Sequence, residues 1–235
     1  MNLQECLDVL ARGKLSNLSL VSKGKVLEEA IPEVVDAINE GLRRIYTNLT
    51  IKENNVILEL TESRTDYEIT SEHSLRNWNP DDPFSSYKYY IRDTDVNPFQ
   101  DDILVILEVW DDLGRKRPIN DPDSPLGVYV DQPNNLSVNF TREGRVLNVI
   151  YRAKHLDLVP TKLSTRIQLP ENLYGALFSY VAYLLMGRMN TQEAVANSAR
   201  YFNEYQSIIN EITMNSTLNP DKLVSDSKFY IRGWV

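Results

Sequence analysis

Cysteine, histidine and long apolar runs are all scarce in this 235-residue chain, and each scarcity excludes a class of protein. The single cysteine, Cys6, excludes an internal disulfide and is typical of a protein assembled in a reducing compartment. No apolar run reaches the roughly 18 to 20 residues that a membrane-spanning helix needs. The first residues also lack the basic and apolar stretches of a signal peptide. We therefore expect a cytoplasmic protein with no membrane partner.

Positive charge is also in short supply. The chain has 25 Lys and Arg against 33 Asp and Glu, with a formal net charge of -8. Proteins that bind nucleic acid through its phosphates depend on clustered cations, and the only clusters are Arg43-Arg44 and Arg115-Lys116-Arg117. The composition argues against direct nucleic-acid binding. An acidic bore would instead let a duplex pass without adhering.

The chain offers little for acid-base or nucleophilic chemistry. His73 lies in a polar, turn-like stretch and His155 follows the last predicted strand, so the pattern favours a structural role for both. Cys6 lies on an apolar helical pattern, which predicts a buried structural thiol. We predict no catalytic, metal-binding or cofactor-binding residue.

Acidic pairs are a recurrent polar pattern. Asp93, Asp95, Asp101 and Asp102 carry the hard oxygen ligands that calcium and magnesium prefer. With either histidine they form an enzyme hypothesis, a metal-dependent hydrolase. However, their spacing fits no calcium loop, which requires acids at regular positions, a central glycine and a terminal glutamate. We expect solvated loop acids that contribute to net charge.

Helical periodicity marks both ends of the chain. Residues 3–11 predict a short helix, and residues 26–48 predict a longer one with Pro32 at its start or at a kink. Pro170 stands where a first helical position should be, and a broad apolar face after it predicts a helix that stops at Gly187.

A second helix is predicted directly afterwards. Asn190 is a good N-cap, with Glu193 as its capping-box partner, and apolar residues recur at helical spacing beyond it. Because the connection between the two helices is short, we expect them to form an antiparallel hairpin.

The pattern between these helical regions changes to a period of two. Asp111–Gly114 and Thr141–Gly144 both predict tight turns, the second as the loop of a hairpin. Residues 78–91 are rich in turn formers and aromatics and predict a long loop or insertion. Beyond a strand at 55–62, we expect one small antiparallel sheet from strands at 103–110, 128–130, 136–140 and 145–151.

These patterns predict the α+β class: a helical bundle with a long C-terminal helical hairpin, a small antiparallel β region and an extended tail. The predicted divisions are 1–50 for the N-terminal helices of the bundle, 51–160 for the β region with its loops, 161–214 for the hairpin that completes the bundle, and 215–235 for the tail.

The tail is the most informative segment. Terminal residues are normally polar and frayed unless something holds them, and an extended aromatic segment is a common means of docking on another chain. We therefore expect an assembly subunit, the alternative being a tail that packs on its own domain. The tail ends in the aromatic and apolar residues Phe229, Tyr230, Ile231, Trp234 and Val235.

Four segments carry a family resemblance. They are INEGLRRIY at 38–46, VIYRAKH at 149–155, IQLPENL at 167–173, and a helical hairpin over 178–205. Followed by an aromatic tail, this order is similar to that of the head-to-tail adaptor proteins of short-tailed bacteriophages, also called connector, neck or tail tubular A proteins. The β region looks longer here than in the shortest members.

The resemblance implies a structural virion protein of the phage neck, assembled in the host bacterial cytoplasm. It implies a homo-oligomeric ring, usually of twelve copies, beneath the portal protein, with the hairpin in the ring wall and the tail on the portal. The β region would face tail nozzle or tail fibre proteins, and DNA would pass through the lumen without specific binding.

A basic cluster is the remaining candidate contact. Arg115, Lys116 and Arg117 would meet an acidic patch on a neighbouring subunit or a fibre. The alternative function that we consider is another tail or baseplate component that attaches fibres.

Overall fold

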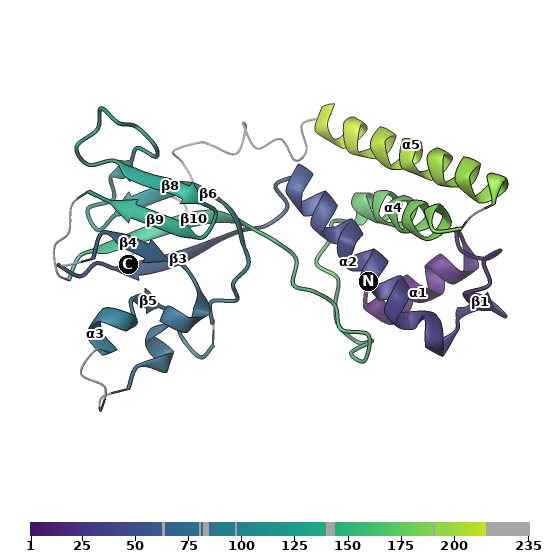
Figure 1. Cartoon of the computed structure of the whole chain (residues 1–235), viewed down its shortest axis with the longest axis horizontal. Coiled ribbons are helices and arrows are strands. Elements are labelled where there is room, and N and C mark those ends of the chain that lie inside the picture. Colours follow the sequence, from purple (N-terminus) through teal and green to yellow (C-terminus); the bar gives the residue numbers. More distant parts are fainter. Residues whose placement is uncertain are drawn as a thin grey trace. The chain divides into compact units, whose positions relative to one another are not determined.

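The computed structural model describes residues 1–62, 64–79, 81, 85–96, 98–139, 144–189 and 191–214. The chain divides into two compact units (Figure 1). The helical unit combines residues 1–51 with the chain from 155 onward, and the β unit is the stretch between them, Lys52–Lys154. The predicted tail, 215–235, lies outside the described residues.

The helical unit confirms the helices predicted near both ends of the chain. Pro32 lies in the first turn of α2, where its missing N–H costs nothing, so it begins the helix and does not kink it. The described elements of this unit are α1 (Leu3–Arg12), β1 (Val21–Ser22), β2 (Lys25–Val26), η1 (Glu28–Ala30), α2 (Ile31–Asn48), η4 (Glu171–Leu173), α4 (Tyr174–Gly187) and α5 (Gln192–Met214).

Residues 26–30 do not belong to the long helix, contrary to the prediction. Strands β1 and β2 form a tight hairpin, with Val21 opposite Val26. At its turn Lys23 and Gly24 both have positive φ, 50° and 72°, as in the turns that suit two-residue hairpin loops. The apolar spacing continues through this region, but Lys25–Val26 pairs as a strand and Glu28–Ala30 forms a 3-10 helix before α2 begins.

The boundaries of the last two helices also differ from prediction in detail. Pro170 precedes the short helix η4 as its N-cap, and α4 begins only at Tyr174. Helix α4 ends at Gly187, as predicted. The hydroxyl of Thr191 accepts a hydrogen bond from the backbone N–H of Ala194 at 3.2 Å, so Thr191 caps α5. Asn190, the predicted cap, lies outside the described residues.

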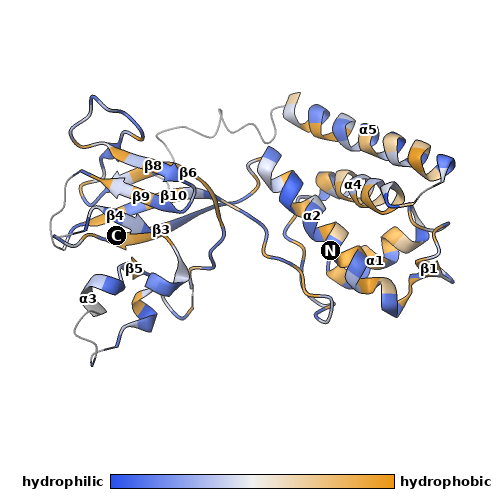
Figure 2. Ribbon diagram, in the orientation of Figure 1, coloured by the Kyte–Doolittle hydropathy of each residue, from blue (hydrophilic) through white to orange (hydrophobic). Residues whose placement is uncertain are grey.

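Helix α4 lies between α2 and α5 and supplies much of the core of the helical unit (Figure 1). It is apolar on most sides, whereas α5 alternates apolar and polar residues around its axis (Figure 2). Edge-to-face aromatic contact joins Tyr180 of α4 to Tyr205 of α5, with ring centroids 4.9 Å apart. On the other side, Gly41 of α2 leaves room for the Leu177 side chain of α4.

The segment between the β unit and η4 is tied to α2. The side-chain amide of Asn39 donates to the carbonyl of Leu158 at 3.0 Å and accepts from its N–H at 2.8 Å. Nearby, the Arg43 guanidinium pairs with Asp157 at 2.9 Å. Residues that precede and follow the β unit in the sequence therefore form one helical unit.

The β unit contains only antiparallel pairs among its described strands. They form a five-stranded sheet in the order β5-β3-β10-β6-β7 and a three-stranded sheet in the order β4-β9-β8. The elements are β3 (Glu53–Glu59), β4 (Asp66–Glu68), η2 (Ser71–His73), η3 (Leu75–Asn77), α3 (Ser85–Lys88), β5 (Ile91–Arg92), β6 (Ile103–Asp111), β7 (Lys116–Arg117), β8 (Val128–Gln132), β9 (Asn135–Val138) and β10 (Val146–Ala153).

One core joins the two sheets, because alternate residues of β3, β6 and β10 face side chains from β4, β8 and β9. The predicted hairpin across residues 141–144 is wrong: β9 pairs with β8 and β4, whereas β10 pairs with β3 and β6. The observed hairpin turns at Pro133-Asn134, between Gln132 and Asn135. By contrast, the predicted turn at 111–114 is present and connects β6 to β7.

The predicted long loop at 78–91 is only partly correct. Tyr90 is fully buried and Ile91 begins β5, at the edge of the five-stranded sheet. The Tyr67 and Tyr90 rings meet edge to face with centroids 5.1 Å apart. Because residues 78–91 are rich in turn formers, the sequence pattern did not indicate that Tyr90 and Ile91 are buried. The combination of helices and antiparallel sheets agrees with the predicted α+β class.

We expect substitutions of two helical glycines to separate close packing from helix propensity. A Cβ at Gly41 would lie 2.8 Å from Leu177 Cδ1, which is buried and has little room to move. Gly41→Val should lower the free energy of unfolding by about 1–3 kcal/mol through overpacking. Gly175→Ala makes only an ordinary 3.5 Å contact with Ile208 and gains helix propensity, so stability should be unchanged or higher.

Urea denaturation of the variants Gly41→Val and Gly175→Ala measures both effects. Equal midpoints for the wild-type chain and Gly41→Val would contradict the packing of α2 on α4.

Candidate functional site

Both histidines are held in structural contacts. His73 stacks on Tyr90, with ring centroids 4.7 Å apart, and its Nδ1 lies 2.8 Å from the Lys88 carbonyl. His155 is buried, and its Nε2 accepts from the Gln168 N–H at 3.0 Å. The accepting Nε2 requires the proton on Nδ1, which lies 2.5 Å from the Leu156 carbonyl. These contacts agree with the prediction that His73 and His155 have structural roles.

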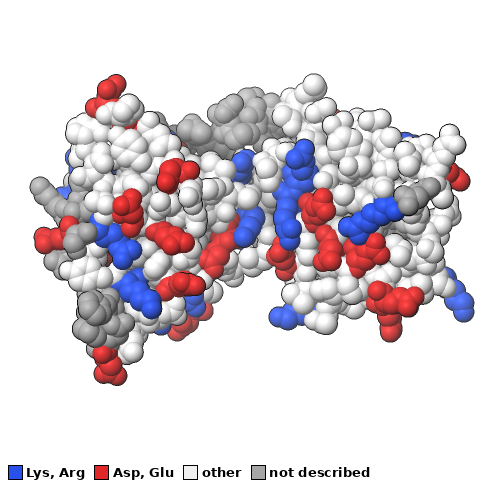
Figure 3. All heavy atoms as spheres, in the orientation of Figure 1, with Lys and Arg blue, Asp and Glu red and all other residues white. Residues whose placement is uncertain are grey.

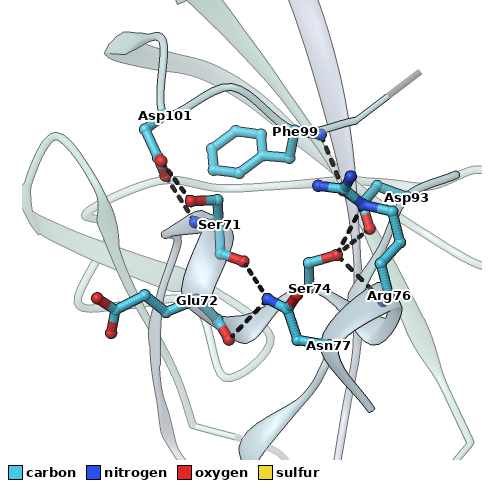
Figure 4. A network of polar contacts seen from close by, with 8 residues as sticks. All are labelled: Ser71, Glu72, Ser74, Arg76, Asn77, Asp93, Phe99 and Asp101. Carbon is cyan, nitrogen blue, oxygen red and sulfur yellow. Dashed lines mark hydrogen bonds and ion pairs between the residues drawn. The ribbon is translucent and has the colours of Figure 1, made fainter. Parts of the chain in front are cut away.

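The predicted loop acid Asp93 is the centre of a hydrogen-bond network (Figure 4). Its carboxylate accepts from the Ser74 hydroxyl, from Arg76 Nε at 2.9 Å and from the Phe99 N–H at 2.9 Å. This network joins η3 to the segment that leads into β6. Asp95 is exposed.

Two further acids tie neighbouring segments together. Asp101 accepts from the backbone and hydroxyl of Ser71, at 2.6 and 2.5 Å (Figure 4). Asp102 is buried and accepts from the Tyr151 hydroxyl at 2.7 Å, and Lys52 Nζ lies 3.3 Å away. Burial and the Asp102 carboxylate raise the pKa of Tyr151. These acids are therefore structural, not simply solvated, which corrects the expectation for three of the four.

Among the residues that the structure describes, no group of three or more His, Cys, Asp or Glu side chains is placed to hold a metal ion. Cys6 is buried, as predicted, and burial raises the pKa of its thiol to about 12. No helix in the described ranges is long and apolar enough to cross a membrane.

The basic cluster divides into accessible and buried members. Arg117 is buried and donates to Asp111 at 2.5 Å, so its charge is committed within the β unit. Arg115 pairs with the same carboxylate at 3.1 Å but remains more than half exposed. Lys116 pairs with Glu108 at 2.8 Å and is also exposed. Of the three residues in this cluster, only Arg115 and Lys116 can therefore present charge to another molecule.

Asp111 organises the β6–β7 turn. It accepts from the N–H groups of Leu113 and Arg115, at 3.0 and 2.8 Å, in addition to its two ion pairs. Burial would raise the pKa of its carboxyl, but the Arg115 backbone bond, the Arg117 charge and the remaining bonds together lower it. The sequence indicated the turn, but not that a buried ion pair holds it.

On the face that Figure 3 shows, Lys and Arg are interspersed with Asp and Glu in each unit. On this face, the mixture differs from the clustered positive charge of a nucleic-acid footprint.

A polar cavity of about 450 Å³ opens in the β unit, and sequence reasoning missed it. Its walls come from the end of β4, the β8–β9 turn and the segment that enters β6. Because these segments are distant in sequence, only the pairing of the strands brings them together.

The described part of the chain thus offers packed helices, a β unit and exposed charged side chains. Comparison with protein families matches residues 1–223 to the SU10 adaptor protein family. The chain belongs to this family, and the resemblance to phage head-to-tail adaptors is confirmed. It is a bacteriophage virion structural protein of the head-tail connector. A search of curated proteins finds no match to the chain.

We expect Asp111→Asn to destabilise the β unit by about 3 kcal/mol, because it removes the carboxylate that pairs with the buried Arg117 at 2.5 Å. Since folding lowers the pKa of Asp111, its contribution is present above pH ~4 and is lost as the pH falls through the folded pKa. The variant should therefore lose part of the acid sensitivity of the wild-type chain.

Thermal unfolding at neutral and acidic pH checks this expectation. Asp112→Asn is the matched control, because Asp112 forms only a partly exposed pair with Arg145 at 3.3 Å, worth at most about 1 kcal/mol. If the two variants unfolded alike, Asp111 would not hold the turn.

Proposed function

We propose that this protein is a ring-forming head-to-tail adaptor that binds beneath the portal, extends the DNA channel and provides attachment for tail components. Family membership and the aromatic segment that follows α5 together carry the proposal. We further propose twelve copies, assembly in the host bacterial cytoplasm and a final position in the virion neck. No catalysis or cofactor is part of this function.

The helical unit suits a ring wall. Salt bridges tie α5 and the end of α4 to the N-terminal part of the chain, with Lys14 paired to Glu204 at 2.6 Å and Arg188 to Glu33 at 3.0 Å. A closed ring needs two different surfaces of each subunit to meet head to tail. A well-packed helical unit can present both without rearranging.

The aromatic segment suits attachment to the portal. It follows Met214, the last residue of α5, and contains the side chains that most often anchor protein interfaces. Extended segments that become ordered on binding are suited to assembly in sequence. We propose that Phe229, Tyr230, Ile231, Trp234 and Val235 dock on the portal protein.

Net charge suits a DNA channel. With -8 on each copy, about twelve copies would carry on the order of a hundred negative charges. Even a modest fraction of these charges in the lumen would keep the duplex from adhering. DNA would therefore pass during ejection without specific binding.

Removal of the aromatic segment tests portal docking. We expect a chain that ends at Asn215 to keep the thermal stability of its helical unit, because α5 ends at Met214. It should nevertheless lose binding to purified portal rings in a sedimentation assay. Trp234→Ala alone should weaken binding at least ~30-fold if it is an anchor.

Trp78→Ala is the matched control, since Trp78 is a half-exposed tryptophan of the β unit. Portal binding of equal strength by the full-length and shortened chains would reject docking through this segment.

The alternative function, a tail or baseplate component that attaches fibres, places the main contact on the β unit. The exposure of Arg115 and Lys116 supports a role for this surface in either function. In the adaptor, it would bind the nozzle or fibres while the aromatic segment binds the portal.

We expect the double variant Arg115→Ser, Lys116→Ser to weaken attachment of purified nozzle or fibre protein, with portal binding unchanged. Attachment should also fall with added salt in the wild-type chain. Arg12→Ser is a control for charge, because Arg12 is an exposed arginine of α1. Unchanged attachment by the double variant would show that the basic cluster does not bind the nozzle or fibre protein.

A further inference from the structure

Strand β6 has one open edge. On one side β10 pairs with it from Ile103 to Asp111, but on the other side β7 pairs only at Val109 and Trp110. Within the described part of the chain, no strand pairs with the outer side of residues 103–108. Backbone groups on such an edge can form a ladder with an added strand.

The side chains along this edge are apolar, in the run Ile103-Leu-Val-Ile-Leu107. Ile106 is buried in the core, while Val105 is 41% exposed. Two irregularities interrupt the pairing with β10, where the register passes over Leu104 and Leu107. Bulges of this kind keep an open edge from pairing indiscriminately, so a strand that binds here needs a further source of selectivity.

The polar cavity adjoins this edge, because Ile103 at the start of β6 is also part of its wall. Three acidic residues, Glu68, Glu72 and Asp101, line the cavity, against one basic residue, Lys154. The Asp101 carboxylate already accepts two hydrogen bonds from Ser71. The cavity is therefore complementary to a positively charged group.

The acids of the cavity differ from others in the β unit. Glu59, Glu108 and Asp111 each form an ion pair with an arginine or lysine of the same unit. Glu68 and Glu72 are exposed and form no ion pair with any residue in the described ranges. Their charge is available to a partner.

We propose that the open edge of β6 accepts an extended strand from another polypeptide, and that a lysine or arginine of this strand enters the cavity. Backbone pairing along residues 103–107 would supply affinity, and the cavity acids would select a basic partner. The inference rests on the proposed function only for the origin of the strand, which would belong to a tail component that attaches to the β unit.

Two synthetic peptides test strand acceptance on the full-length protein. Both alternate valine and threonine, and they differ only in carrying lysine or glutamate at their ends. Fluorescence anisotropy should show the lysine peptide binding at least ~10-fold more tightly. Hydrogen exchange should show that this peptide protects amides of residues 103–108.

Variants separate the edge from the cavity. The double variant Glu68→Gln, Glu72→Gln should reduce the preference for lysine and keep the fold, since both side chains are exposed. Val105→Lys places a charge on the open edge and should abolish binding of both peptides. Val96→Lys adds the same charge at a residue that is 95% exposed and should bind like the wild-type chain.

Equal binding of the two peptides, or no protection of residues 103–108, would overturn the proposal. So would self-association of the free protein that Val105→Lys removes and Val96→Lys leaves, because the edge would then belong to a second copy. Portal binding is measured separately, so failure of strand acceptance leaves the proposed adaptor function standing.

Discussion

Burial of α4 is the constraint on which the rest of the structure depends. This helix is apolar on most sides, so no single neighbour can cover it, and α2 and α5 together bury it. Since α2 precedes the β unit and α5 follows it, the chain must leave the helical unit and return to it. It does so as neighbouring antiparallel strands, with the Ala153 N–H bonded to the Lys52 carbonyl at 2.9 Å. The two ends of the β unit are thereby held together.

Helices were more predictable from the sequence than strand pairing, and the reason is physical. A helix satisfies its own backbone, so local periodicity and Gly187 suffice to place α4 and its end. A strand's pattern indicates which side chains face the core but not which strand lies beside it. The strands predicted at 136–140 and 145–151 therefore correspond to β9 and β10, whereas their predicted pairing with each other was wrong. Thr191 is a favourable cap by residue type, as is the predicted Asn190, and only the structure shows that the Thr191 hydroxyl accepts from the Ala194 N–H.

The features of the candidate site also divide into those that the sequence predicts and those that only the folded structure reveals. Exposed charge at Arg115 and Lys116 could be predicted from a turn signal, because turns lie at the surface. The burial of Arg117 could not, because it depends on the Asp111 carboxylate that folding places beside it. The structural roles of Asp93, Asp101 and Asp102 could not be predicted either, because they depend on hydrogen bonds from residues distant in sequence: Ser74, Ser71 and Tyr151. The open edge of β6 has a sequence signal, an apolar run, but the same run would also suit a central strand.

We propose that this adaptor protein binds through three surfaces: a helical unit that forms the ring, a β unit that contacts tail components, and an aromatic segment that docks on the portal. Cryo-electron microscopy of the purified portal–adaptor complex tests this most directly. We predict density for residues 229–235 against the portal protein, with α4 and α5 in the wall of a ring. Density for those residues against the helical unit of their own subunit, in the assembled complex, would contradict the account.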